Sequence, residues 1–196
     1  RRNAGDFNPD TAELAQSVLA IEKDLDDVFR SVMDERLTSL RIRIHGDYHL
    51  GQVLRTGADV IIIDFEGEPA RTISERRLRR SPLRDVAGML RSVDYAAHVA
   101  MLQERESGAL RPDEVAFLKP WAKTWVSLVT HAFWDEYCLA AAGAGFLPQD
   151  PEVCRDLLRA LMLEKALYEV EYELNNRPAW VSVPLGAVLP IASEGK

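Results

Sequence analysis

The chain has 196 residues, of which 47% are hydrophobic and 28% charged, and its net charge is −7. This length and composition suit one folded domain, or one lobe of a larger protein, and exclude wholesale disorder, while the acidic balance argues against nucleic acid or an anionic membrane as the main partner. No apolar stretch approaches the roughly 18–20 residues of a membrane span, and the 2 cysteines form no redox or zinc motif, so we expect no membrane partner and a reducing cytoplasm.

The N-terminal part carries apolar residues at alternating steps of four and three, which predicts one long amphipathic helix over residues 10–38. Asp10 is the expected N-cap of this helix, with Glu13 three residues further on. The same spacing is compatible with a coiled coil, but a single helix that faces a core is the simpler interpretation.

Residues 41–69 predict a small β element. The stretch "RIRIHGD" alternates Arg with Ile, which is typical of a short strand with one buried face. The stretch "QVLRTGADVIIIDFE" predicts a strand, a turn at Gly57 and a second strand. Because Val60–Ile63 is uniformly apolar, we expect the second strand to be buried on both faces.

The rest of the chain predicts helices. Ser81 and Pro82 mark one helix start, a second pattern runs over 113–142 with Pro120 expected to start, break or kink it, and a last helix covers 151–175. The basic run over 75–84 reads as a solvated turn rather than a phosphate site. The predicted fold class is therefore α+β and mostly helical, in a single domain over 1–196 whose titratable residues concentrate on the β element.

Two carboxylates lie at adjacent strand ends of this element, Asp47 in "HGDYHLGQ" and Asp64 in "IIIDFE". Phosphoryl transfer from a nucleotide needs a carboxylate that orients the attacking hydroxyl, together with oxygen ligands for Mg²⁺. Asp64, Gln52 and Glu66 supply oxygens of this kind. The β element is thus a candidate phosphotransfer site.

The same residues resemble a known superfamily. "HGDYHLGQ" followed by "IDFE" is similar to the catalytic loop and metal-binding segment of protein-kinase-like enzymes, and to the aminoglycoside phosphotransferase and choline kinase branch in particular. With "SPLRDVAGMLRS" and "EKALYEVEYELNNRPAWVSVPL", the chain resembles bacterial maltokinases over residues 41–189. The resemblance implies the C-terminal lobe of a kinase fold that uses ATP and Mg²⁺ to convert maltose to maltose 1-phosphate in trehalose, maltose and glycogen metabolism. It also implies a possible partner, because such enzymes occur fused behind trehalose synthase.

The resemblance further implies roles for individual residues. Asp47 would be the catalytic base, Gln52 and Asp64 metal ligands, and Glu66 a further metal ligand. His45 and Asp85 would support the catalytic loop. The helical part over 81–189 would bind the sugar, with packing in a helical core as the alternative for each aromatic candidate. The candidate sugar contacts are His49, Trp134, Tyr137, Tyr168 and Tyr172.

Two features depart from the superfamily pattern. Gln52 stands where most members have Asn. No N-terminal lobe is recognisable, because no G-x-G-x-x-G lies between strands and none of the lysines follows a β run. We therefore expect a C-terminal lobe without most of the nucleotide clamp. Because phosphoryl transfer depends on positioning, we expect little or no kinase activity from the isolated chain.

Three other functions stay open. The chain could belong to a kinase of another sugar, an aminoglycoside or a choline-like alcohol, since the base and metal residues do not specify the acceptor. It could be a non-catalytic docking module beside trehalose synthase. His45 and Asp47 with His98 or His131 also imitate the ligand triad of non-haem iron oxygenases, although those sites usually lie in β barrels.

Overall fold

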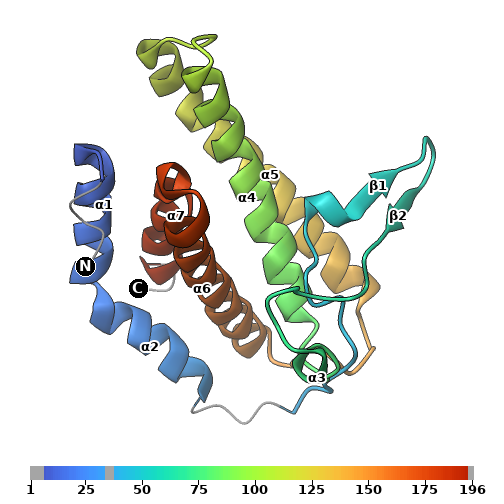
Figure 1. The fold of residues 1–196 in the computed structure, drawn as a ribbon. Coiled ribbons are helices and arrows are strands. Elements are labelled where there is room, and N and C mark those ends of the chain that lie inside the picture. The colour runs from blue at the N-terminus through green and yellow to red at the C-terminus, as the bar shows by residue number, and fades with distance from the viewer. Residues whose placement is uncertain (1–6, 34–37, 194–196) are drawn as a thin grey trace. The chain divides into compact units, whose positions relative to one another are not determined.

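The structure is a computed structural model that describes residues 7–33 and 38–193. It divides into two compact units, one formed by residues 1–37 with 150–196 and the other by residues 38–149 (Figure 1). Each unit is described by itself. The predicted fold class is confirmed, since helices dominate and the strands form one small hairpin. The single domain over 1–196 stays a prediction.

The first unit is a helical bundle. It contains α1 (Pro9–Ala20), α2 (Glu22–Met33), α6 (Pro151–Asn176), the short helix η3 (Pro178–Trp180) and α7 (Ser182–Ser193). Helix α7 packs against α6 and α1, and α2 packs against α6. Apolar side chains from all four longer helices form its core. The buried members are Val18, Val28, Ala160, Leu163, Ala166, Val181, Leu185, Ala187, Val188 and Ile191.

The single helix predicted over 10–38 is wrong, because α1 and α2 are separate helices. The chain turns at Ile21, whose N–H donates to the carbonyl of Val18 at 3.3 Å, a bond that spans only three residues. Apolar spacing continues across this turn, and for that reason the sequence pattern did not reveal it. Residues 34–37 of the predicted helix lie outside the described residues.

The predicted N-cap of the first helix is also wrong. Asn8 caps α1, and its side-chain oxygen accepts a hydrogen bond from the N–H of Thr11 at 2.9 Å. Pro9 occupies the first helical position, where a missing N–H is harmless, so the helix begins one residue before Asp10.

The C-terminal helices were predicted in part. Helix α6 matches the prediction over 151–175, and its N-cap Asp150 accepts from the N–H of Glu152 at 2.8 Å. Helix α7 was not predicted, because its apolar sequence contains Pro184 and Pro190. Pro184 lies in the first turn, where helix N–H groups have no intrahelical partner, and the helix continues through Pro190.

The second unit combines two long helices with a hairpin (Figure 1). Helices α4 (Leu83–Glu106) and α5 (Pro112–Ala140) run antiparallel and pack against each other. The hairpin of β1 (Val53–Arg55) and β2 (Val60–Ile62) precedes the short helix α3 (Ile73–Arg76). No described helix is long and apolar enough to cross a membrane.

The hairpin was predicted, but its burial was not. Strands β1 and β2 pair antiparallel around a turn in which Gly57 has a φ of 75°. Val60, Ile61 and Ile62 are 57%, 48% and 39% exposed, so the expectation of a strand buried on both faces is wrong. Apolar composition predicts burial only where a second layer covers the sheet, and the sheet has only these two strands in the described chain.

The strand predicted at "RIRIHGD" is reduced to a single bridge. Ile42 and Arg80 exchange two backbone hydrogen bonds, of 3.0 and 2.9 Å, and no longer ladder forms in this described segment. The basic run thus contributes one residue, Arg80, that pairs with Ile42, three residues before His45.

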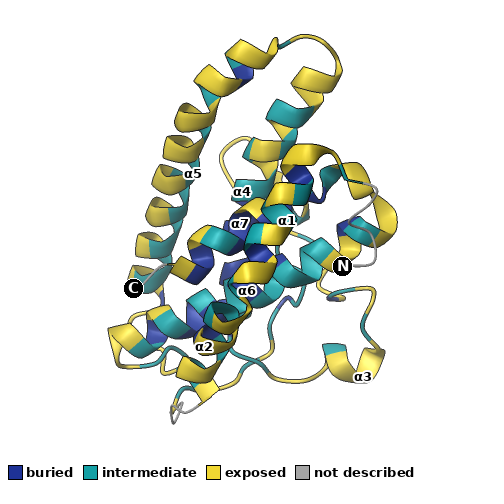
Figure 2. Ribbon diagram, turned by 90° about the vertical axis from the view of Figure 1, so that its left-hand side faces the viewer, coloured by how far each residue is buried: buried dark blue, intermediate teal, exposed yellow. Residues whose placement is uncertain are grey.

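The two long helices begin close to the predicted positions. The hydroxyl of Ser81 accepts from the N–H of Leu83 at 3.4 Å, and Pro82 is the N-cap of α4 rather than its first residue. Helix α5 continues through Pro120, which therefore neither starts nor ends it. Its outward face is exposed along most of its length (Figure 2), including Trp121 and Trp125.

A charged cluster lies along α4 in this unit. Arg91 is buried and its guanidinium pairs with Asp94, whose carboxylate also lies 3.3 Å from Nδ1 of His98. The hydrogen bond with Asp94 raises the pKa of His98 above its ordinary value, although burial opposes this. Burial raises the pKa of Asp94, but the hydrogen bond from His98 and the charge of Arg91 outweigh it and lower the pKa overall.

This cluster predicts a pH-dependent stability. Because the folded pKa of His98 is raised, its contribution is fully present below the ordinary value of 6.5 and is lost as pH rises through the folded pKa. His98 is half-exposed, so we expect at most about 1 kcal/mol. Urea unfolding at pH 5.5, 7 and 9 should show a loss that His98→Gln removes. Identical pH profiles for both proteins would contradict this.

Candidate active site

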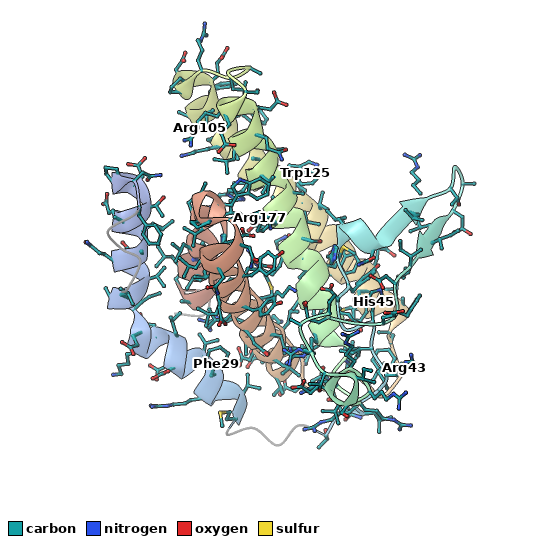
Figure 3. The ribbon with its side chains drawn as sticks, viewed as in Figure 1. Phe29, Arg43, His45, Arg105, Trp125 and Arg177 are labelled. Atoms are coloured by element: carbon teal, nitrogen blue, oxygen red, sulfur yellow. The ribbon has the colours of Figure 1, made fainter. Side chains whose placement is uncertain are left out.

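The predicted catalytic loop over 45–52 is held by the first turn of α4. The carboxylate of Asp85 accepts hydrogen bonds from the N–H of His45 at 2.7 Å and from that of Gly46 at 2.9 Å. Burial raises the pKa of Asp85, while these two N–H groups oppose the increase. One carboxylate therefore fixes two successive backbone groups at the beginning of the loop. The first of them belongs to His45, which is labelled in Figure 3.

His45 connects this loop to the segment that follows β2. The residue is 7% exposed, its Nε2 lies 2.7 Å from the carbonyl oxygen of Ile63, and its Nδ1 accepts from the N–H of Asp47 at 3.3 Å. Both contacts are satisfied when Nε2 carries the proton. The rings of Tyr48 and Phe65, both later in the sequence, lie near it, with centroids 5.6 and 5.0 Å away. His45 thus ties together the two predicted motifs.

Asp47 lies in the middle of the loop. Its side chain is 17% exposed, and one carboxylate oxygen is 3.7 Å from Nε2 of His49. His49 in turn accepts from the N–H of Gly51 through Nδ1 at 3.0 Å, and so caps the short helix η2 (Leu50–Gln52). This contact gives His49 a role within the loop in addition to the predicted contact with sugar.

The structure brings together Asp64 and Gln52, two of the predicted metal ligands. Nε2 of Gln52 donates to Oδ2 of Asp64 at 2.9 Å, and the N–H of Ile63 donates to the carbonyl of Gln52 at 3.0 Å. Asp64 has a φ of 62°, and no other non-glycine residue in the described chain has a positive φ. Glu66 is exposed and makes no hydrogen bond or ion pair with the described residues. A positive φ at a residue other than glycine, as at Asp64, is often found at functional sites.

This pair fits a magnesium ion that is shared with a phosphate. No group of three or more His, Cys, Asp or Glu residues that could hold a metal occurs in the described parts of the chain. Asp64 supplies a carboxylate, and Gln52 keeps its amide oxygen available because its nitrogen makes the contact with Asp64. Mg²⁺ commonly takes one or two carboxylates and completes its shell with water and phosphate oxygens. The donor set suits that arrangement rather than a site built from protein alone.

The aromatic candidates for sugar binding contact other side chains. On α5, the rings of Trp134 and Tyr137 stack with centroids 6.2 Å apart. On α6, in the other unit, Nζ of Lys165 lies 5.1 Å from the centroid of Tyr168. The guanidinium of Arg177, which is labelled in Figure 3, similarly lies 5.6 Å from the ring centroid of Tyr172. A role in sugar binding stays a prediction for all of them.

Two residues of α4 that touch the catalytic loop were not predicted, Gly88 and Ser92. Gly88 approaches the carbonyl of Tyr48, and the hydroxyl of Ser92 accepts from the N–H of Leu50 at 3.1 Å. The signal available in the sequence was a glycine within a helical pattern, which often marks close packing.

The fold matches half of a known kinase structure. A glucosamine kinase in crystal form B superposes with a TM-score of 0.68 and 24% identity, over 94% of this chain and 48% of that one. A glucosamine kinase in complex with glucosamine, ADP and inorganic phosphate gives a TM-score of 0.63 and 23% identity, over 92% and 47%. The fold is thus consistent with the C-terminal lobe of a protein-kinase-like enzyme, as predicted.

Sequence comparison leads to the same group. A glucosamine kinase of Streptacidiphilus jiangxiensis is 30% identical over 145 residues, which are 73% of this chain and 30% of that protein. One of Mycolicibacterium smegmatis is 33% identical over 152 residues, which are 77% and 34%. No protein-family model matches the chain. The chain is homologous to these glucosamine kinases, and it spans about a third of their length.

Proposed function

We propose that the chain is the C-terminal catalytic lobe of an ATP-dependent sugar kinase. The observation that carries this proposal is the arrangement of Asp47, Gln52 and Asp64 on two segments that His45 and Asp85 hold together. A base and two oxygen ligands in such an arrangement suit phosphoryl transfer, which is catalysed by positioning and charge stabilisation. Homology to kinases that act on a sugar supports the same reaction class.

Each residue then has a distinct role. Asp47 orients the sugar hydroxyl and accepts its proton, while Asp85 and His45 keep the loop in place. Asp64 and Gln52 would hold Mg²⁺, with Glu66 as a further oxygen ligand, and the bound ion would supply positive charge to the phosphate groups of ATP.

The acceptor we propose is maltose, with phosphorylation at the anomeric hydroxyl. The support is the resemblance of the two central motifs and their flanking segments to bacterial maltokinases, which extends to a functional link with trehalose synthase. Glucosamine is the second candidate, because the relatives and the solved structures carry that name. An aminoglycoside or choline-like acceptor is the third.

The nucleotide clamp is proposed to lie in the part of the architecture that this chain does not match. The chain spans 30% to 34% of the curated relatives and 47% to 48% of the solved chains. Activity of the whole protein would then need residues beyond the 196 described by this sequence.

The test is a comparison of acceptors with the full-length gene product. With ATP and Mg²⁺, ³¹P NMR should show maltose 1-phosphate as the main product, and glucosamine, choline and an aminoglycoside should react much more slowly. The isolated 196-residue chain should show little or no turnover. Faster phosphorylation of glucosamine would contradict maltose as the acceptor but would agree with a sugar kinase. Absence of phosphoryl transfer to every acceptor would contradict the proposed kinase activity.

A further inference from the structure

We propose that Gly88 and Ser92 are positioning residues of the catalytic loop, which together with Asp85 form a seat on α4. This inference rests on the proposed function, because its consequence is the placement of Asp47 relative to Gln52 and Asp64. Neither residue touches the proposed reacting groups, so both act through the loop.

The three seat residues lie on one face of α4. They are separated by three and four residues, which places them one above the other along the helix. They contact the loop in the order of its sequence. The contacts are Asp85 with His45 and Gly46, Gly88 with Tyr48, and Ser92 with Leu50.

Gly88 is the middle contact and depends on the absence of a side chain. A Cβ atom at this position would lie 2.6 Å from the carbonyl oxygen of Tyr48. The obstructing atom belongs to the backbone, so the loop itself would have to move. Glycine in a helix interior is about 1 kcal/mol less favourable than alanine, which makes its presence here consistent with a packing requirement. Gly88 therefore sets how closely Tyr48, the neighbour of Asp47, approaches the helix.

Ser92 is the last contact and holds the end of the loop. Its hydroxyl accepts from the N–H of Leu50 at 3.1 Å and donates to the carbonyl of Met89 at 2.7 Å. Leu50 begins the short helix η2, and Gln52 ends it. The orientation of this turn determines where the Gln52 side chain meets Asp64. Ser92 thus influences the proposed metal ligand Gln52 indirectly, through Leu50 two residues earlier.

The seat brackets the catalytic residues. Asp85 binds Gly46, directly before Asp47, and Gly88 contacts Tyr48, directly after it. Ser92 binds Leu50, two residues before Gln52. A shift of any one contact changes the separation of base and metal ligand without removing either. Misplacement by about 1 Å can slow an enzyme about 100-fold.

The kinetic test uses variants of the full-length gene product. Gly88→Ala should lower kcat about 100-fold through displacement of the loop. Ser92→Ala should lower it about tenfold, the equivalent of one hydrogen bond. The KM for the sugar should stay unchanged in both, and Ser92→Thr should restore most of the activity because it keeps the hydroxyl. The thermal midpoint of Gly88→Ala should not fall in parallel with kcat, since alanine favours the helix.

Two matched controls separate the seat from general helix effects. Gly186→Ala adds a Cβ to a glycine of α7 that has no atom within 4 Å of that position. Ser31→Ala removes a hydroxyl that, like Ser92, bonds to a carbonyl three residues earlier, that of Val28 at 2.9 Å. Both should retain wild-type kcat. Equal losses in the controls and the seat variants would overturn the proposal, as would unchanged kcat in both seat variants.

A second measurement is independent of catalysis. Hydrogen exchange of the Leu50 amide, followed by NMR or mass spectrometry, should accelerate about tenfold in Ser92→Ala on loss of one hydrogen bond. The amide of Gly46, held by Asp85, should keep its protection. This exchange pattern in a protein that lacks kinase activity would support the seat and overturn the proposed function. Unchanged exchange of Leu50 would overturn the seat, even if Gly88→Ala failed to fold.

Discussion

Replacement of Asp47 by Asn is expected to reduce kcat about 1,000-fold, because an amide cannot accept the proton of the attacking hydroxyl. The backbone N–H of residue 47, which donates to Nδ1 of His45 at 3.3 Å, is unaffected by the change. The loop should therefore keep its conformation. Phosphoryl transfer by the full-length gene product, measured with circular dichroism and thermal unfolding, tests both expectations together.

A matched variant in the same β element gives the control for Asp47→Asn. Asp59 is an exposed acid of the hairpin turn, and its carboxylate accepts from the N–H of Val60 at 2.7 Å. Asp59→Asn should retain nearly all activity. Wild-type turnover in Asp47→Asn would exclude Asp47 as the base. Absence of turnover in the unmodified protein as well as in Asp47→Asn would favour the docking-module alternative, because a non-catalytic module has no use for this carboxylate.

Replacement of Asp85 by Ala should lower the free energy of unfolding by about 3 kcal/mol, because two partly buried N–H groups lose their acceptor. These groups belong to His45 and Gly46. Asp85→Asn should have an intermediate effect, since its amide oxygen can accept one of the two bonds. Urea denaturation of the three proteins gives the ranking. The same variants should lose activity in the same order, because the loop carries Asp47.

The control for Asp85→Ala is Asp113→Ala. Asp113 also lies in the first turn of a long helix, α5, but it is exposed and its nearest ion-pair partner is Arg111 at 3.4 Å. Both acids interact with the helix dipole, which is worth about 0.3–1 kcal/mol at an exposed site. An equal loss of stability in the two variants would mean that Asp85 acts only through that dipole, and that the loop does not depend on it.

Local patterns were sufficient to predict most elements of the fold. The hairpin, α6 and the starts of α4 and α5 each have a turn residue or cap within a few positions of their ends, such as Gly57 and Asp150. The division between α1 and α2 has no such residue, because the apolar spacing passes through Ile21 without interruption. Helix α7 was missed for the opposite reason, since its prolines look like breaks and one of them is tolerated in the first turn.

Properties that depend on distant partners were the hardest to predict. The apolar strand β2 is exposed, because burial of a strand depends on what covers it rather than on its own composition. For the candidate site, the motif spacing identified Asp64 and Gln52, and the structure shows them in contact. The seat on α4 could not be foreseen in this way. Ser92 and Leu50 are 42 residues apart, and their contact depends on the rotation of a helix against a loop.

The backbone conformation of Asp64 has a consequence for the evolution of this position. At a φ of 62°, most side chains strain the backbone, whereas Asp, Asn and Gly tolerate this region. A mutation to most other residues would therefore be disfavoured on conformational grounds, independently of its effect on the proposed metal ion. Of the three tolerated residues, only Asp brings a negative charge. The backbone conformation and the need for a negative charge at the proposed metal site thus both favour Asp. A homologue that has lost the carboxylate would be expected to carry Asn or Gly here.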